Sequence, residues 1–278
     1  MNIKELKVQS ERNRKRLIEV VYNAHAGHTG GNLSSINVLT TLYFKYLNIN
    51  PKNLNSPDRD RFVMSKGHCA EALFVTLQAK GILANDDLNT LGTFKSPLAG
   101  HPTVNVKGIE VSSGALGHGL SFGVGMAIAA KMDKKSYKTY VLMGDGEQGE
   151  GSVYEAAMAG NHYHLDNLVA IIDRNHLQIS GNTEDVMSLE DLPSKWRAFG
   201  WDVKEMNGDD IADIVKTIDY LDYSSGKPHV IISHTTKGLG VSYMENIAKW
   251  HHRVPNEEQY KIALTEIEQR IKFAEEEK

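Results

Sequence analysis

The sequence has very little cysteine, no long apolar run and no excess of positive charge. Cys69 is the one cysteine among 278 residues, which excludes an internal disulfide framework and a cysteine-rich metal site. No apolar stretch approaches the ~20 residues that cross a bilayer. The N-terminal segment, MNIKELKVQSERNRKR, lacks the apolar core of a secretory signal. We therefore expect a soluble cytoplasmic protein without a membrane partner.

The net charge limits the classes of partner further. The formal charge is −4, with 31 Lys and Arg against 35 Asp and Glu. Nucleic acid binding depends on a basic surface that neutralises phosphates, so nucleic acid is not expected as the main partner. Hydrophobic residues make up 41% and charged residues 24% of the chain, which is ordinary for a globular protein with a full core.

Apolar segments typical of strands alternate with helical segments along the chain. The expected strands are 61–64, 108–111, 140–143, 168–172, 201–203 and 229–233. The expected helices are 3–24, 35–46, one closed by Gly81, 119–132, one between the turn at Gly144 and the strand at 168–172, 209–221 and a capped C-terminal helix at about 256–274. This alternation predicts an α/β fold with a doubly wound, mostly parallel sheet and helices on both faces. No repeat or long linker interrupts it, so we expect a single domain over residues 1–278.

A glycine-rich turn that carries one carboxylate follows the third of these strands. Asp145 lies between Gly144 and Gly146, and Asn175 follows the next strand. Because parallel strands end at the same edge of a sheet, Asp145 and Asn175 are expected side by side where open α/β sheets bind ligands. Carboxylate and amide oxygens suit Mg²⁺, whose coordination is often completed by phosphates and water. The stretch therefore predicts a metal-bridged diphosphate site.

Three loops each carry a histidine beside a glycine. These histidines are His28, His68 and His101. Loop histidines flanked by glycine are poor core fillers and good candidates for the wall of a cleft, although any one of them alone is more often a surface or structural residue. Imidazole titrates near neutrality, which suits proton transfer.

Together these motifs resemble those of the transketolase-type enzymes that use thiamine diphosphate. The GDG turn followed about thirty residues later by asparagine resembles their thiamine diphosphate signature, and AGHTGG, SKGH and GHP resemble transketolase loops. The resemblance implies that Asp145, the Asn175 side chain and the Leu177 backbone carbonyl hold Mg²⁺, or else Ca²⁺, which in turn holds the cofactor. It also implies that His28, His68 and His101 line the substrate channel.

The resemblance implies further contacts with the cofactor. The full set of cofactor-binding residues is His68, Gly114, Ala115, Leu116, Gly144, Asp145, Gly146, Glu147, Asn175 and Lys237. For Lys237, which follows a strand, an exposed turn lysine is an equally good interpretation. The segment GALGHG resembles the family loop GPLGQG but carries His118 where glutamine is usual, which affects either phosphate contact or substrate preference.

Two more groups of residues match the family. A late active-site histidine corresponds to His251 if the segment is aligned on Trp250, or to His252 if it is aligned on Pro255, and we prefer His252. Glu150 and Glu155 match acidic residues that form a network at the subunit interface. Taken as bare residues, these glutamates are ordinary acids at a helix start.

The resemblance covers nearly the whole chain but only the first half of a full-length transketolase, the diphosphate-binding domain. The half that grips the aminopyrimidine ring is not in this sequence. The chain thus resembles the N-terminal subunit of a split transketolase, paired with a C-terminal subunit in a heterotetramer with two copies of each chain. The implied reaction moves a two-carbon ketol unit from a ketose, or its phosphate, to an aldose, or its phosphate, as in the pentose phosphate pathway.

Four alternatives remain. The chain could belong to a related thiamine diphosphate enzyme, such as a deoxyxylulose-phosphate synthase or a keto-acid dehydrogenase, although the GHP loop and the WHH segment favour transketolase. It could serve a split transketolase for an unusual sugar, including one without a terminal phosphate. A non-catalytic scaffold subunit is disfavoured because it would not need Asp145, Asn175 and three loop histidines. A dinucleotide-binding module is disfavoured because no G-x-G-x-x-G follows the first strand.

Overall fold

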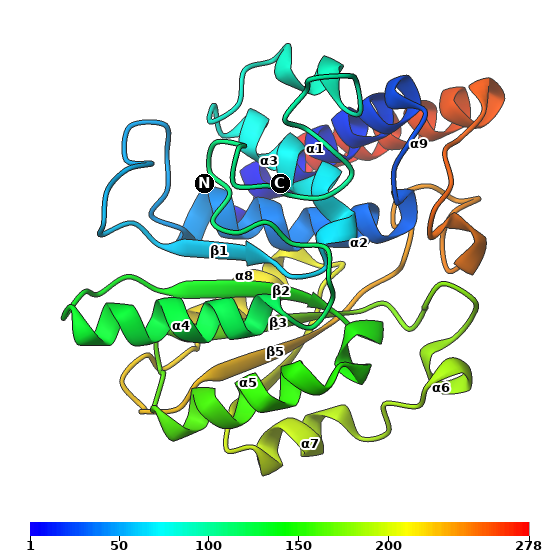
Figure 1. The fold of residues 1–278 in the computed structure, drawn as a ribbon. Coiled ribbons are helices and arrows are strands. Elements are labelled where there is room, and N and C mark those ends of the chain that lie inside the picture. Colours follow the sequence, from blue (N-terminus) through cyan, green and yellow to red (C-terminus); the bar gives the residue numbers. More distant parts are fainter. Residues whose placement is uncertain (278) are drawn as a thin grey trace.

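Five segments form a sheet of parallel strands, and four of them are mainly apolar. The computed structural model describes residues 1–277. The strands are β1 (Arg61–Met64), β2 (Thr139–Gly144), β3 (Leu168–Arg174), β4 (Asp202–Asn207) and β5 (His229–His234). They lie in the order β1-β2-β3-β5-β4, and every neighbouring pair is parallel. With helices on both faces (Figure 1), this is the doubly wound α/β fold that the sequence predicts.

The longer helices divide between the two faces of the sheet. They are α1 (Ile3–Ala24), α2 (Thr29–Thr41), α3 (Ala70–Ala79), α4 (Gly119–Met132), α5 (Gly151–His162), α7 (Leu192–Ala198), α8 (Ile211–Asp219) and α9 (Glu257–Glu276). In Figure 1, α1, α2, α3 and α9 lie above the sheet, and α4, α5 and α7 lie below it. None of the helices within residues 1–277 combines the length and the apolar character that a membrane crossing needs.

Short helical turns complete the chain. They are the π-helical turn η1 (Leu42–Tyr46), the 3₁₀ turns η2 (Gly67–Cys69), η3 (Asp87–Thr90), η4 (Gly146–Gly149) and η5 (Ala248–Trp250), and the short helix α6 (Thr183–Val186). Two of them, η2 and η4, directly follow loops at strand ends. They turn the backbone of the SKGH and GDG motifs toward the same edge of the sheet.

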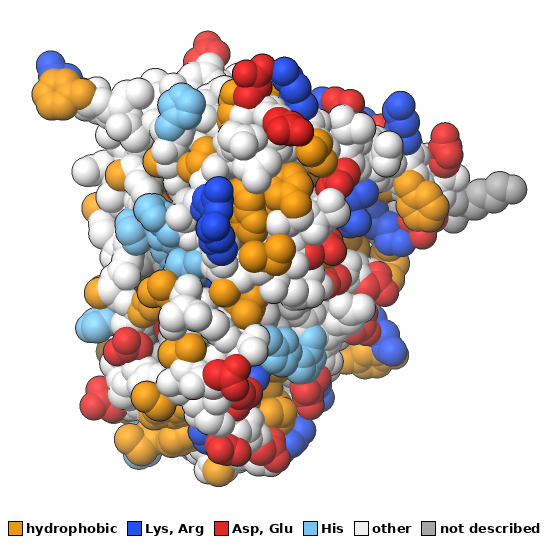
Figure 2. Space-filling view, turned by 90° about the vertical axis from the view of Figure 1, so that its right-hand side faces the viewer, with side chains coloured by type: hydrophobic (Ala, Val, Ile, Leu, Met, Phe, Trp, Pro, Cys, Tyr) orange, Lys and Arg blue, Asp and Glu red, His pale blue; other side chains and the backbone are white. Residues whose placement is uncertain are grey.

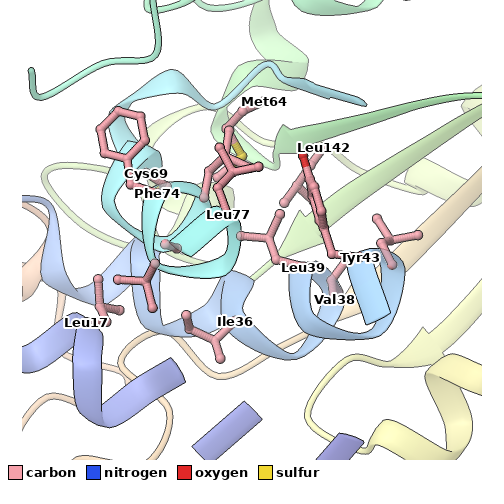
Figure 3. Close-up of a cluster of buried hydrophobic side chains, with 14 of the residues drawn as sticks. Leu17, Ile36, Val38, Leu39, Tyr43, Met64, Cys69, Phe74, Leu77 and Leu142 are labelled. Atoms are coloured by element: carbon pink, nitrogen blue, oxygen red, sulfur yellow. The ribbon is translucent and has the colours of Figure 1, made fainter. Parts of the chain in front are cut away.

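Each face of the sheet has its own hydrophobic core. Side chains alternate along a strand, so Tyr140 and Leu142 of β2 pack with α1, α2, α3 and α8, while Val141 and Met143 pack with α4, α5 and α7. Figure 3 shows the first of these cores, where Leu142 points toward Leu39 of α2. Because both faces are covered, β2 and β3 are buried along their whole length.

Most of the expected elements are found, and their limits agree best where a cap is present. The C-terminal helix begins after a capping box in which the Asn256 side chain accepts from the Gln259 N–H at 2.8 Å. The helix before Gly81 ends as expected, with Gly81 at φ +79°. The helix α7 was not predicted, although Asp191 caps it by accepting from the Ser194 N–H at 2.9 Å.

Two expectations were wrong. Residues 108–111 form a loop and not a strand, because Gly108 has φ +84° and lies in a turn closed by the Ile109 N–H and the Val106 carbonyl, next to Leu77 and Ile82. The helix expected from Ser35 begins at Thr29 instead. Every residue of that helix is buried, so close packing offsets the low helix propensity of Gly30 and Gly31.

Two glycines of α4 provide a matched test of this packing. A Cβ at Gly123 would lie 2.5 Å from Cγ2 of Val141 in β2, whereas a Cβ at Gly125 would meet no atom within 4 Å. We expect Gly123→Ala to lower the free energy of unfolding by about 1–2 kcal/mol, because the helix must move off the sheet. Gly125→Ala should raise it by up to about 1 kcal/mol through helix propensity. Urea unfolding of the isolated chain measures both; equal effects of the two changes would contradict the packing argument.

Candidate active site

A pocket of about 290 Å³ opens where β2 and β3 end. It brings together predicted residues from segments far apart in sequence: His28, His68, Gly114, Leu116, Gly144, Asp145, Gly146, Glu147, Asn175, Leu177, Lys237 and His251. Figure 2 looks onto this edge of the molecule, where histidine side chains gather. A larger groove of about 720 Å³ lies between α1, α8 and α9, but none of the predicted site residues lines it.

Five predicted residues lie outside the pocket lining. His101 and His252 stand beside it, with ring centroids 6.2 and 4.5 Å from that of His28. Ala115 is exposed on its loop. Glu150 and Glu155 are exposed at the start of α5, and Glu150 packs closely under Gly117 of the GALGHG loop.

The histidines form one cluster around His28. Its ring lies 5.2 Å from His68 and 5.6 Å from His251, and the rings of His68 and His251 are stacked at 5.3 Å. Burial, and then the neighbouring His252 and His101, lower the pKa of His28 to about 4. Burial and the Lys237 ammonium lower the pKa of His251 to about 3. These imidazoles are therefore neutral at neutral pH, so each can donate one hydrogen bond and accept another.

Asp145 and Asn175 directly follow β2 and β3, and the register of these strands pairs Gly144 with Asp173. The Asp145 carboxylate accepts from the N–H groups of Gly146 at 2.8 Å and His176 at 2.7 Å. The Asn175 side-chain oxygen accepts from the Leu177 N–H at 3.1 Å. Backbone contacts therefore hold both side chains at the sheet edge. Burial, and after it the nearby Asp173 carboxylate, raise the pKa of Asp145.

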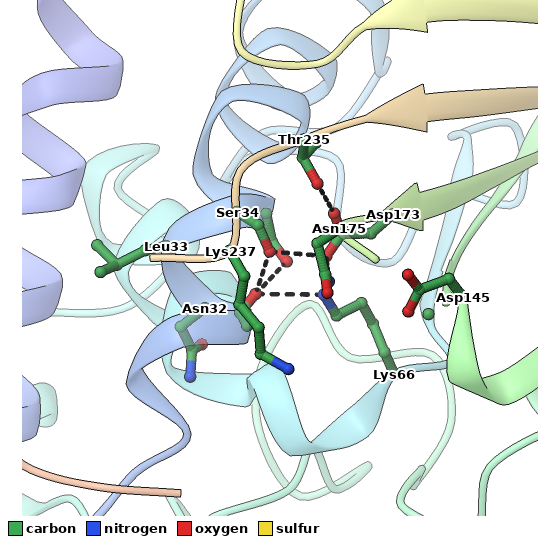
Figure 4. Close-up of polar contacts among 12 residues, drawn as sticks. Asn32, Leu33, Ser34, Lys66, Asp145, Asp173, Asn175, Thr235 and Lys237 are labelled. Carbon is green, nitrogen blue, oxygen red and sulfur yellow. Dashed lines mark hydrogen bonds and ion pairs between the residues drawn. The ribbon is translucent and has the colours of Figure 1, made fainter. Parts of the chain in front are cut away.

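A buried ion pair lies beneath these two residues. The Lys66 ammonium pairs with the Asp173 carboxylate, which also accepts from Asn175 Nδ2 at 3.1 Å and from Ser34 Oγ at 2.7 Å (Figure 4). Burial alone would raise the pKa of Asp173, but the Lys66 charge and the hydrogen bonds from Lys66, Thr235 and Ser34 together outweigh it, and the pKa is lowered. The same pairing raises the pKa of Lys66 against the effect of burial. Asp173 thus fixes the amide of Asn175 with its oxygen turned toward Leu177.

Glu147 joins two glycine loops at the edge of the pocket. Its carboxylate accepts from the N–H groups of Gly117 at 2.8 Å and Gly144 at 2.9 Å, and from the Ser65 hydroxyl. Burial raises its pKa despite these donors. Its carboxylate is therefore committed to shaping the loops around the pocket.

Lys237 reaches into the pocket from the loop after β5. Its ammonium donates to the Leu177 carbonyl at 3.0 Å and lies 3.0 Å from Nδ1 of His251. Burial, and then the Lys66 charge, lower its pKa. Because the side chain is 2% exposed, the interpretation as an exposed turn lysine does not hold.

The residues present fit a metal diphosphate. Asp145, Asn175 and Leu177 offer a carboxylate, an amide oxygen and a backbone carbonyl, which are hard oxygen ligands of the kind Mg²⁺ takes. The Leu177 carbonyl already accepts from a cation, the Lys237 ammonium, so its oxygen faces the pocket. Only one carboxylate belongs to this set, which agrees with the absence, within residues 1–277, of any group of three or more His, Cys, Asp or Glu placed to hold a metal.

Sequence reasoning missed several residues of the pocket and its support. Lys66, Gly31, Gln178 and Ile179 line it, and Asp173 lies beneath it. Lys66 lies within the SKGH motif. Asp173 and Arg174 are charged residues that end an otherwise apolar strand, which is a signal for buried partners. Gln178 and Ile179 lie on a loop whose course the sequence does not reveal.

The chain matches a known family over most of its length. The family model described as "Transketolase, thiamine diphosphate binding domain" matches residues 7–268. A relative from Phocaeicola vulgatus, named as one subunit of an apulose-4-phosphate transketolase, is 65% identical and covers 100% of this chain and 99% of its own length. A relative from a Clostridium species, named as a 6-deoxy-6-sulfo-D-fructose transketolase subunit, is 39% identical over 96% of this chain and 98% of its own.

A solved structure supports the same family. The transketolase from Campylobacter jejuni superposes on 96% of this chain with a TM-score of 0.90 and 33% sequence identity. This chain spans 43% of the length of that protein. The chain therefore belongs to the transketolase family and contains its thiamine diphosphate binding domain.

Proposed function

We propose that this chain is the diphosphate-binding subunit of a split transketolase. A separate pyrimidine-binding subunit would complete the site, and the complex would move a two-carbon ketol unit from a ketose donor to an aldose acceptor. The observation that carries the proposal is the pocket in which Asp145, Asn175 and Leu177 meet the histidine cluster. Relatives whose names describe them as transketolase subunits match the chain over nearly their full length, which supports the split arrangement.

The proposed metal ligands and the histidines lie at opposite ends of the pocket. Asp145, Asn175 and Leu177 would hold Mg²⁺, with Ca²⁺ as the alternative, and the metal would hold the diphosphate beside the glycine loops. When bound, thiamine diphosphate supplies the carbanion and the electron sink for breaking a carbon–carbon bond. The neutral imidazoles of His28 and His68 would bind sugar hydroxyls, with His101 beside them, and these three histidines would transfer protons.

The late histidine of this site is His251 rather than His252, which the sequence favoured. His251 lines the pocket, stacks on His68 and contacts Lys237. The His252 side chain is exposed and lies against His28 at the rim. We therefore assign His251 to direct contact with the substrate and His252 to the entrance.

For the substrate, we propose apulose 4-phosphate. Two relatives, 65% and 44% identical to this chain, are named for apulose 4-phosphate. A relative that is 39% identical in sequence is named for 6-deoxy-6-sulfo-D-fructose, so this sugar is the second candidate for the donor. Both names point away from the pentose phosphate pathway that the resemblance implied.

The proposed assembly has two copies of each subunit in the cytoplasm. Glu150 and Glu155 are exposed at the start of α5, where a second copy of this chain could contact them. Glu150 also packs under Gly117, beside the loop that carries Leu116 of the pocket. This position agrees with an acidic network that joins two sites.

The central test is activity with and without a second subunit. The purified chain with Mg²⁺ and thiamine diphosphate should show no ketol transfer, and adding a pyrimidine-binding transketolase subunit encoded beside it should restore turnover. Apulose 4-phosphate should be the best donor, measured by product formation against 6-deoxy-6-sulfofructose and xylulose 5-phosphate. Robust turnover by this chain alone would contradict the split arrangement, and a preference for either other donor would contradict the proposed substrate.

The metal ligand has its own test. Asp145→Ala should weaken Mg²⁺-dependent binding of thiamine diphosphate by at least about 100-fold, because the charged ligand is lost. Isothermal titration calorimetry measures this, with Asp86→Ala on an exposed loop as the control. Unchanged binding by Asp145→Ala would remove the metal assignment.

His101 lies at the rim and should act in turnover only. In the complex, His101→Ala should lower kcat by about 10²-fold or more, because a proton-transfer group is lost. The Kd for thiamine diphosphate should stay within about twofold of the unchanged protein, since His101 is not among the residues that line the diphosphate pocket. His162→Ala, exposed on α5, is the control and should alter neither quantity.

A further inference from the structure

Lys237 makes a contact that the proposed metal site could not keep. Its ammonium lies 3.0 Å from the Leu177 carbonyl oxygen, which is the backbone ligand assigned to the metal. The same ammonium lies 3.0 Å from Nδ1 of His251, at the substrate end of the pocket. One buried cation thus touches both ends of the site.

The surroundings hold Lys237 in this position. The Gly238 N–H donates to the Gly30 carbonyl at 3.0 Å, and the Asn246 N–H donates to the Lys237 carbonyl at 2.9 Å. The stem passes close to Gly30, where a Cβ would lie 3.2 Å from Cγ of Lys237 and 3.0 Å from the Trp250 carbonyl oxygen. The backbone is fixed on both sides of Lys237, so mainly the end of the side chain can move.

Two cations would compete for the Leu177 oxygen. A divalent metal sits about 2.0–2.6 Å from such an oxygen, and the ammonium sits at 3.0 Å. The two charges would stand within roughly 6 Å of each other in a buried site, where repulsion is poorly screened. A diphosphate removes this conflict, because its oxygens attract the metal and accept hydrogen bonds from a lysine.

We propose that Lys237 makes metal binding conditional on the diphosphate. Without cofactor, the ammonium occupies the Leu177 carbonyl and hinders a metal arriving alone. When metal and diphosphate arrive together, the ammonium leaves Leu177 for the phosphate oxygens. The inference rests on the proposed function, because it takes the ligand set Asp145, Asn175 and Leu177 from it.

The displacement of the Lys237 ammonium would also affect His251, at the substrate end of the pocket. An ammonium can only donate, so Nδ1 of His251 must accept and the ring proton must lie on Nε2. When Lys237 moves to the phosphate, Nδ1 loses this donor. Lys237 is thus a positioning residue for His251, and cofactor binding changes the hydrogen bonding of a substrate-contacting histidine.

Mn²⁺ binding followed by electron paramagnetic resonance tests the competition directly, without any turnover. We expect Lys237→Met to bind Mn²⁺ alone at least about tenfold more tightly than the unchanged chain, because the competing charge is gone. The gain in Mn²⁺ affinity on adding thiamine diphosphate should shrink by a similar factor. Lys237→Gln keeps a hydrogen-bond donor but no charge, and its Mn²⁺ affinity should match that of Lys237→Met. This second variant keeps the test valid if methionine disturbs the fold. Lys249→Met, an exposed lysine on η5, is the matched control and should bind like the unchanged chain.

The second readout is the His251 ring. Nitrogen chemical shifts of His251, assigned by comparison with His251→Gln, should change when Mg²⁺ and thiamine diphosphate are added. In the Lys237→Met variant without cofactor, the His251 nitrogen shifts should already be those of a ring that has lost its hydrogen bond from lysine. Equal Mn²⁺ affinity of the unchanged chain and both Lys237 variants would overturn this proposal alone. Failure of the unchanged chain to bind Mn²⁺ with thiamine diphosphate would overturn the ligand set as well.

Discussion

The buried pair of Lys66 and Asp173 is the interaction on which the site depends. It joins the segment after β1 to the end of β3, and its carboxylate also binds Ser34 of α2 and Thr235 after β5. A buried ion pair is stable only if further hydrogen bonds satisfy its charges, and those four segments provide them. Because Asp173 also holds the Asn175 amide, the pair fixes one proposed metal ligand.

The sequence predicts the centre of the sheet well because its central strands are apolar on both faces. β2 and β3 are continuous apolar runs, as parallel strands covered by helices require. It predicts segments poorly where packing overrides local preference. The start of α2 contains two glycines and forms a helix only because every residue is buried. Ile109 and Val111 suggest a strand, but Gly108 turns the chain and they pack from a loop.

For the site, the spacing of motifs was enough to predict which strand ends meet, but not which side chains bind one another. Parallel strands end together, so Asp145 and Asn175 could be paired from the sequence alone. The role of Lys66 could not, because its partner Asp173 is 107 residues away. The choice between His251 and His252 depends on which neighbour faces the pocket after a 3₁₀ turn, and a one-residue shift in alignment reverses it.

The electrostatics of the pocket explain why so many histidines can share it. Charged imidazoles at ring separations of 4.5–6.2 Å would repel one another, and burial beside Lys66 and Lys237 adds to that cost. His28 and His251 therefore stay neutral, and a neutral imidazole offers one donor and one acceptor. Sugar hydroxyls need both, whereas a phosphate needs donors or cations. In the proposed site the pocket thus separates its chemistry in space. The lysine cations and the proposed metal ligands stand at the strand ends, where a diphosphate would bind, and the neutral rings stand where a polyhydroxylated substrate would bind.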